Sequence, residues 1–449
     1  MPVFMNEEEK ELIQIGPATP SGEVFRRYWL PVEVSANLGG KPGSFPGFNN
    51  PLRVRVLSED LVLFRDGSGK PSLLAEHCSH RGTSLLYGRV EENCLRCLYH
   101  GWAYDGEGNV IDTPAEPPGS NLKHTVRHPS YPCFEVAGLI FAYLGPQDKI
   151  PPFPRYEELF REDGVRLTGN GGRIQKSPAF LQTLDNVLDV WHRDILHGWF
   201  KGMPPRTTLH WGQNGEPASP LKYERSPWGA YYIYIANTPK AGVYHYHETH
   251  AVFPCVRHVG GSGKGLHWAV PIDDHTTRWF SVSFHPTVDS HPQTDVAQSL
   301  LDPRPMDGHA NLPDDWVEQV GRWWNLGHPW RQGQIWEDEV AMGTQGDPAH
   351  DGFPDWERWH LGTSDRGMML NHQLWREQID RVREGLDPIG IIRGHAAEEL
   401  IRVPAAQFHL GFDEAMRLFN MSLEDRIAEF SHATPHSAGP RVAEPTVRR

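Results

Sequence analysis

Two short pairs of cysteine and histidine are the strongest candidates for metal ligands in this chain. Cys78 and His80 are separated by one residue, and Cys97 and His100 are separated by two. Each pair combines a soft thiolate with an imidazole. A 2Fe–2S cluster with unlike irons needs two Cys on one iron and two His on the other. If each loop supplies one ligand to each iron, the two loops hold the cluster from opposite sides.

Two other interpretations of these residues have to be weighed. Zinc sites with two Cys and two His usually group like ligands together, as C-x2-C and H-x3-H. Cys94 also forms a C-x-x-C pattern with Cys97, but a thioredoxin-like dithiol opens a helix, and these residues lie between strand-like runs. The mixed spacing therefore favours a Rieske 2Fe–2S centre, with Cys94 as a buried bystander. Histidine ligands raise the potential of such a centre into a range useful for single-electron transfer.

A second group of polar residues follows the pattern N-x-x-D-x-x-H-x4-H, with Asn186, Asp189, His192 and His197. Two histidines and one carboxylate are the ligand set of non-haem Fe(II), which leaves open positions for O₂. Because the histidines are five residues apart, we expect the helix to loosen or kink between them. Asp189 lies one turn before His192 and can accept its second ring N–H. Two histidines on a helix more often pack than bind metal, but an upstream redox cluster favours an iron site.

The third ligand of such an iron should be a carboxylate far along the chain. Glu337, Asp338 and Glu339 are three adjacent candidates. Acidic runs are usually solvated surfaces, so the residues alone leave the choice among the three open.

Composition limits the classes of function. The 449 residues include 43 Lys and Arg against 57 Asp and Glu, a net charge of −14, which disfavours nucleic acid and anionic membranes as partners. The N-terminus lacks the pattern of a signal peptide, and no run of apolar residues is long enough to span a bilayer. Five Cys without a disulfide framework suit a reducing cytoplasm. The 16 Trp, 13 Tyr and 19 Phe leave room for an aromatic-lined pocket.

The pattern of elements predicts an α+β fold. We expect an N-terminal helix within residues 1–24, an all-β domain over 25–145 that holds both Cys/His pairs, and a mixed catalytic domain over 146–431. Residues 432–449 have the composition of a disordered tail. Within the catalytic domain we expect a helix over 181–200, strands at 231–235, 249–253 and 279–284, and a helix that begins at Ser364 or Asp365 and stops at Gly385.

In order and spacing, these motifs resemble the catalytic (α) subunits of Rieske non-haem iron aromatic-ring oxygenases over nearly the whole chain. The region 331–386 resembles the phthalate-dioxygenase-like branch, in which a Gln-Asp pair precedes a Gln-Gly or Met-Gly step. This sequence has Glu337 in place of the Gln and keeps Asp338.

The resemblance implies an all-β Rieske domain followed by a helix-grip domain of antiparallel sheet with helices. It also implies roles for single residues: Cys78 and Cys97 bind one cluster iron, His80 and His100 bind the other, His192, His197 and Asp338 hold the catalytic iron, Asn186 lies near that iron, and Asp189 bridges to a cluster histidine of a neighbouring subunit.

The function that the resemblance implies is that of an oxygenase component. Electrons come from NAD(P)H through a separate flavin reductase or ferredoxin, and O₂ is used to oxidise an aromatic carboxylate by ring hydroxylation or oxidative O-demethylation, for example of a lignin-derived acid. A homotrimer is expected. The alternative is a Rieske ferredoxin-type electron-transfer protein, which would need only about the first 145 residues.

Pocket residues are harder to predict. From Tyr244 to His250, aromatic and histidine residues alternate with period two, so they divide between the two faces of a strand. We interpret this run as a sheet edge with polar side chains rather than as an extra metal site. One face can line the substrate pocket, with Arg257 or Arg225 as the anchor for a carboxylate.

Overall fold

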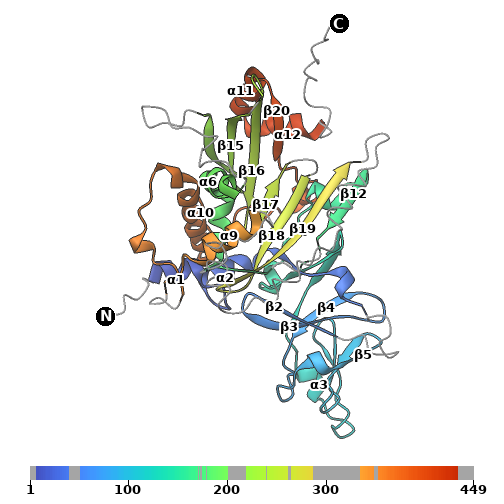
Figure 1. Cartoon of the computed structure of the whole chain (residues 1–449). Coiled ribbons are helices and arrows are strands. Elements are labelled where there is room, and N and C mark those ends of the chain that lie inside the picture. Colours follow the sequence, from blue (N-terminus) through green and yellow to red (C-terminus); the bar gives the residue numbers. More distant parts are fainter. Residues whose placement is uncertain are drawn as a thin grey trace.

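The structure is a computed structural model that describes residues 7–39, 51–169, 171, 174–177, 179–200, 219–238, 240–260, 264–286, 334–347 and 352–432. The predicted disordered tail lies outside these residues from 433 onward. The predicted α+β class is confirmed: small antiparallel sheets form the N-terminal part, and one large antiparallel sheet with helices forms the C-terminal part (Figure 1). Among the described residues, no helix combines the length and the apolar character needed to cross a membrane.

Three small sheets make up the N-terminal part. Their strands, in order within each sheet, are β1 (Trp29–Val34), β11 (Leu139–Tyr143) and β10 (Cys133–Val136); β2 (Leu52–Val56), β3 (Glu59–Arg65), β4 (Pro71–Ala75) and β9 (Ser130–Tyr131); and β5 (Arg89–Glu91), β6 (Cys94–Arg96), β7 (Ala103–Asp105) and β8 (Val110–Asp112). A short helix, α3 (Leu122–Thr125), follows β8.

Strand β3 explains why these sheets stack. Its four central residues, Leu61 to Phe64, are all buried. Leu61 and Leu63 join the main core of the protein, whereas Val62 and Phe64 join a smaller core that also contains Cys78 and Cys97. Because successive side chains of a strand point to opposite faces, β3 ties the loops with the Cys/His pairs to the rest of the molecule.

The large sheet of the C-terminal part has nine strands. The main order is β12 (Gly164–Thr168), β19 (Thr276–Pro286), β18 (Lys264–Asp273), β17 (Val256–Val259), β16 (Tyr244–Val252), β15 (Gly229–Asn237) and β14 (Leu221–Ser226), with β13 (Ile174–Lys176) beside β19 and β20 (Ala406–Leu410) beside β16.

The predicted sheet edge at Tyr244 to His250 is wrong. β16 pairs with β15 along its whole length, with β17 over its second half and with β20 over its first half. Nothing near β16 in the sequence indicates β20, which comes from a segment far along the chain. β16 is therefore an interior strand, and its alternate side chains face two different buried environments.

Helices cover the two faces of this sheet. Tyr232 and Tyr234 lie on the face toward α5 (Phe180–Leu188) and α6 (Trp191–Phe200), which we call the inner face. Tyr231, Ile233 and Ile235 lie on the outer face, where they pack with residues of α11 (Phe412–Asn420) and α12 (Leu423–His432). The remaining helices are α1 (Glu7–Ile13), α2 (Pro20–Phe25), α4 (Glu157–Phe160), α9 (Gln334–Gly343) and α10 (Arg366–Arg383).

The predicted C-terminal helix is confirmed as α10. Asp365 precedes it, and Gly385, with φ of 77°, follows its last turn, where the left-handed backbone favours glycine. Trp375 of this helix is fully buried and packs at 5.1 Å against both Phe25 of α2 and Phe180 of α5. The N-terminal helices therefore stabilise the helical layer of the C-terminal part.

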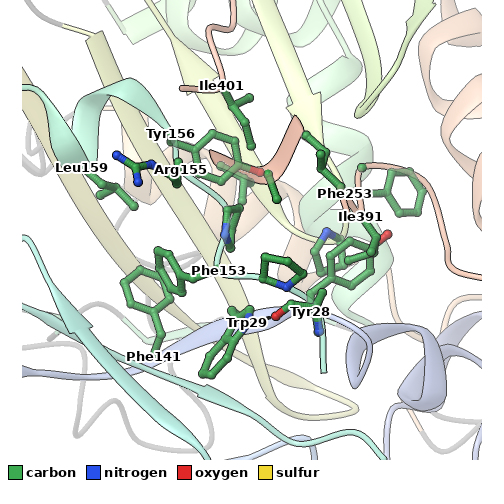
Figure 2. Close-up of a pocket in the computed structure, with 18 of the residues that line it drawn as sticks. Tyr28, Trp29, Phe141, Phe153, Arg155, Tyr156, Leu159, Phe253, Ile391 and Ile401 are labelled. Atoms are coloured by element: carbon green, nitrogen blue, oxygen red, sulfur yellow. Dashed lines mark hydrogen bonds between the residues drawn. The ribbon is translucent and has the colours of Figure 1, made fainter. Parts of the chain in front are cut away.

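The two parts of the chain share one core. Phe141 of β11 packs edge-on against Trp268 of β18 at 5.6 Å, and Arg278 of β19 forms an ion pair with Glu33 of β1 at 2.8 Å. Figure 2 shows an apolar cavity at this junction, lined in part by Phe153, which lies in the proline-rich segment 146–154 between the two parts. Its volume of about 30 Å³ is far below that of a substrate pocket, so this region holds the two parts together.

Candidate active site

The two loops that carry the Cys/His pairs close in the same way. The backbone N–H of Gly82 donates to the carbonyl of Cys78 at 2.8 Å, and the N–H of Gly101 donates to that of Cys97 at 3.2 Å. Both glycines have positive φ, 75° and 77°, and a Cβ on Gly101 would lie 2.7 Å from Pro114. Glycine at these positions lets each loop turn tightly and present its Cys and His together.

The four predicted cluster ligands lie together, with the two Cys on the buried side and the two His toward the surface. Cys78 and Cys97 are 3% and 4% exposed, whereas the rings of His80 and His100 lie nearer the surface with centroids 4.6 Å apart. Nδ1 of His80 is buried and has no hydrogen-bond partner in the described part of the chain. Two sulfurs on the inside and two imidazoles on the outside fit the donor set of a 2Fe–2S cluster with unlike irons.

The alternatives for this site fit less well. A single zinc ion would hold all four side chains at one atom. Here the two Cys share a buried core and the two His rings lie nearer the surface, which suits two ligands on each iron of a dinuclear cluster. Cys94 is buried on strand β6 instead of opening a helix, which argues against a thioredoxin-like dithiol.

Tyr104 contacts the cysteine pair directly. Its hydroxyl lies 3.0 Å from Sγ of Cys78, and its side chain is fully buried. Burial and the neighbouring Cys78 raise the pKa of Tyr104, so the phenol keeps its proton and can donate it in a hydrogen bond. Sequence reasoning assigned this residue no role. Its position two residues after Trp102, on the strand that leaves the second loop, was the available signal.

The predicted single helix over 181–200 is two helices. α5 ends at Leu188, and Asp189 has extended backbone, with φ of −90° and ψ of 114°. The Asp189 carboxylate accepts the N–H of Trp191 at 2.8 Å and lies 3.4 Å from that of His192, as an N-cap does. The break therefore precedes His192, and the predicted kink between His192 and His197 is wrong because α6 runs without interruption from Trp191 to Phe200.

His192 lies between two carboxylates. Its Nδ1 is 3.3 Å from Oδ2 of Asp189, and its Nε2 is 3.6 Å from Oδ1 of Asp338, which comes from α9. Burial raises the pKa of Asp189, but the contacts with His192 and Trp191 outweigh it and hold the pKa below its usual range. An ionised Asp189 keeps the proton of His192 on Nδ1 and leaves Nε2 available to a metal.

The spacing of His192 and Asp338 suits a shared ion. Two ligand atoms that each lie about 2.1 Å from one metal are separated by roughly 3–3.5 Å. The observed 3.6 Å is close to that range. His197 lies on α6, but its side chain and those of Glu337 and Glu339 are outside the described residues. The choice of Asp338 over its neighbours thus has a contact in its favour.

Asn186 and Asp189 line a cavity of about 320 Å³ at the end of α5. Asp185, one turn before Asp189, contributes to the same cavity and accepts hydrogen bonds from Asn371 and His372 of α10, each at 2.8 Å. Sequence reasoning missed this link because its partners are far apart in the chain. It holds the end of α5, and therefore Asp189, against α10.

The two candidate carboxylate anchors lie in different places. Arg225 forms a bidentate ion pair with Glu377, with both contacts at 2.7 Å, and both side chains are exposed. It is therefore not a pocket residue. Arg257 lies on β17 opposite Ala251, on the inner face of the sheet.

The comparisons with known proteins agree with this geometry. The family model described as Rieske [2Fe-2S] domain matches residues 30–134. Phenoxybenzoate dioxygenase subunit alpha of Ectopseudomonas oleovorans is 30% identical over 424 residues, which cover 90% of this chain and 93% of that protein. The oxygenase subunit of dehydrodivanillate O-demethylase of Sphingobium is 28% identical, covering 89% and 86%. The oxygenase subunit of tert-butanol monooxygenase of Aquincola tertiaricarbonis is 42% identical, covering only 42% and 37%.

Solved structures share the fold. NdmA of Pseudomonas putida CBB5 with caffeine has a TM-score of 0.55 at 20% identity, covering 84% of this chain and all of that one. The oxygenase in the ferredoxin complex of carbazole 1,9a-dioxygenase has a TM-score of 0.55 at 19% identity, covering 86% and 96%.

The contact between Tyr104 and Cys78 predicts a change in redox potential. Tyr104→Phe removes one hydrogen bond to a proposed cluster sulfur and should lower the reduction potential by on the order of 50 mV. Protein-film voltammetry measures it, and a rhombic EPR signal with average g below the free-electron value shows that the cluster is assembled. Tyr87→Phe, at an exposed position of the same domain, is the control. An unchanged potential in Tyr104→Phe would contradict the proposed hydrogen bond.

The contact between His192 and Asp338 predicts which carboxylate holds the mononuclear iron. Asp338→Ala should lose that iron and its turnover while keeping the visible spectrum of the cluster, because two remaining ligands hold the ion weakly. Iron analysis together with absorption spectra measures both sites. If Asp338→Ala retained the iron and Glu337→Ala lost it, Glu337 rather than Asp338 would be the third ligand.

Proposed function

Because the chain belongs to the family of catalytic α subunits of Rieske non-haem iron oxygenases, we propose that it oxidises an aromatic carboxylate by ring hydroxylation or oxidative O-demethylation. A protein of this family uses a Rieske 2Fe–2S cluster, a mononuclear iron and electrons that come from NAD(P)H through a separate reductase.

One observation carries the proposal. The chain that holds the two Cys/His pairs also places His192 and Asp338 3.6 Å apart, on two helices that cover the large sheet. A Rieske ferredoxin-type protein has no use for this second site or for the nine-stranded sheet. The second site therefore favours an oxygenase over a protein that only transfers electrons.

The residues of the chain have distinct proposed tasks. Cys78, His80, Cys97 and His100 hold the cluster, and His192, His197 and Asp338 hold the iron, with Asn186 close by. The iron supplies O₂ activation when it is bound. Asp189 orients the His192 ring through Nδ1 and caps α6. A ferredoxin or flavin reductase is the electron donor, and its dependence on NAD(P)H suits a cytoplasmic location.

The substrate class rests on the relatives. Those matched over most of their length are named for phenoxybenzoate and dehydrodivanillate, both aromatic carboxylates. The relative named for tert-butanol matches over little more than a third of its length. The longer matches include the sheet and helices that surround the proposed iron site, so they weigh more for the substrate.

Turnover of a panel of aromatic acids tests this function. With a suitable reductase, NADH and labelled O₂, we expect oxidation of phenoxybenzoate, phthalate, 3-chlorobenzoate or a methoxylated acid. Dioxygenation places both oxygen atoms in a cis-diol. O-demethylation inserts one atom into the methyl C–H bond, and the hemiacetal collapses to formaldehyde and a phenol, while the other atom leaves as water. Turnover of tert-butanol or a steroid with every aromatic acid inert would refute the proposed substrate class.

We also propose a homotrimer with head-to-tail contacts. The Asp189 side chain is 39% exposed although it contacts His192, so it can bond to a second group. In the first part of the chain, Leu98 and Tyr99 next to His100 are 60% and 57% exposed. Figure 1 shows β5, which adjoins the cluster loops, far from α6. An electron route from His100 of one subunit through Asp189 to His192 of the next avoids that separation, and such contacts close into a ring.

Replacement of Asp189 tests the route between subunits. Asp189→Asn keeps the size of the side chain but removes its charge, so the cluster should still be reduced by the partner reductase while substrate oxidation falls about 10- to 100-fold. Stopped-flow absorption follows the cluster, and chromatography follows the product. Asp380→Asn, at an exposed position on α10, is the control. A monomer in analytical ultracentrifugation with full activity would contradict the proposed route.

A further inference from the structure

The inner face of the large sheet carries buried polar atoms that have no hydrogen-bond partner among the described residues. Tyr234 of β15 and His247 of β16 lie opposite each other, and Arg257 of β17 lies on the same face. The Tyr234 hydroxyl, Nδ1 of His247 and Nε of Arg257 are all buried without a hydrogen bond in the described part of the chain. Tyr234 is fully buried and His247 is 4% exposed, so bulk solvent does not reach these two side chains, and only an internal water or a ligand can pair with their free atoms. Such groups are costly unless a ligand pairs with them.

The charges near these atoms are positive. Burial lowers the pKa of His247 well below its usual value, and Arg193, His245 and Arg257 lower it further. Arg193, the residue after His192 on α6, stacks over the Tyr234 ring at 4.4 Å. His247 therefore stays neutral among positive neighbours. Arg257 is partly buried, with its Nε fully covered, and a guanidinium in such surroundings favours an anion that enters from outside.

The outer face of the same strand provides a comparison. Glu248, next to His247 in the chain, is fully buried and contacts His250 at 2.9 Å, Arg426 at 3.1 Å and the Tyr246 hydroxyl at 2.8 Å. There the protein supplies both signs of charge itself. On the inner face no carboxylate of the described residues forms an ion pair with Arg257. Nδ1 of His250 and Nη2 of Arg426 are also buried there without a hydrogen bond among the described residues, so the difference between the faces of β16 is one of charge: the outer face pairs its arginine with a carboxylate, and the inner face does not.

We propose that Arg257 binds the carboxylate of the substrate, with the Tyr234 hydroxyl and Nδ1–H of His247 as further donors. The proposal rests on the proposed oxidation of an aromatic acid and names the residues that select it. Guanidinium matches a carboxylate with two parallel hydrogen bonds. The Thr249 hydroxyl lies 2.7 Å from Nε2 of His247. When this hydroxyl donates to Nε2, the imidazole proton is on Nδ1, where it can reach the ligand.

The surroundings suit an aromatic acid. Tyr232 and Tyr234 stack on His247, with ring centroids 5.7 Å and 4.9 Å away, and form a flat apolar surface beside the donors. The contact of Arg193 with Tyr234 places this surface under the same helix that carries His192. A carboxylate held at Arg257 would therefore set which carbon of the substrate faces the iron.

Matched substrates test the anchor. Arg257→Gln should raise KM for phenoxybenzoate roughly 10- to 100-fold and change that for its carboxamide less than about threefold, because only the acid loses a charge-assisted pair. Arg257→Lys keeps the charge without the bidentate geometry, so its KM for phenoxybenzoate should lie between those of the wild type and Arg257→Gln. Arg225→Gln is the matched control, since that arginine is paired with Glu377 at the surface. The cluster spectrum checks that each variant is folded.

Binding measured without turnover separates the two proposals. Isothermal titration calorimetry of phenoxybenzoate, with Tyr234→Phe as a variant that loses only one hydroxyl, should give a several-fold weaker Kd than the wild type. If the wild type binds aromatic acids but oxidises none, the proposed function fails and the anchor stands. The anchor would be overturned, even in an active oxygenase, if Arg257→Gln raised KM equally for the acid and the carboxamide or changed KM for neither.

Discussion

Asp189 is the residue on which the geometry of the iron site depends. Its carboxylate ends α5, caps α6 through the N–H of Trp191 and contacts Nδ1 of His192. One side chain thus sets the direction of the second helix and the orientation of its first histidine. Because Asp185 is held by Asn371 and His372 one turn earlier, the helix end that carries Asp189 is itself anchored to α10. The orientation of His192 therefore depends on contacts among α5, α6 and α10.

The cluster loops could be predicted from the sequence because the residues that shape each loop are close together in the chain. Cys78 and His80, like Cys97 and His100, lie within one tight turn, and a glycine four residues after each Cys permits the turn. Spacing in the chain therefore maps directly onto spacing in the structure. The end of α10 was predictable for the same reason, since Gly385 directly follows its last turn with the left-handed backbone that favours glycine.

The parts that could not be predicted depend on distant segments. β16 looked like an edge because nothing near it in the sequence announces β20, whose Phe408 pairs with Tyr246. Which face of β16 meets α6, and whether Arg225 or Arg257 is paired, also follow only from packing. The helix break was different. Aspartate is a good N-cap, so Asp189 carried a local signal, but the predicted metal motif drew attention to the histidines instead.

The arrangement separates oxidation from recognition. The proposed iron ligands come from helices α6 and α9, whereas the proposed substrate anchor comes from strands β15, β16 and β17. Side chains on the inner face of the sheet can change without loss of the helical ligand set. Those on the outer face, such as Glu248 and Arg426, cannot change as freely, because removal of one partner leaves the other charge buried and unpaired. Substrate class in this fold can therefore diverge through alternate residues of a few strands while the iron site persists.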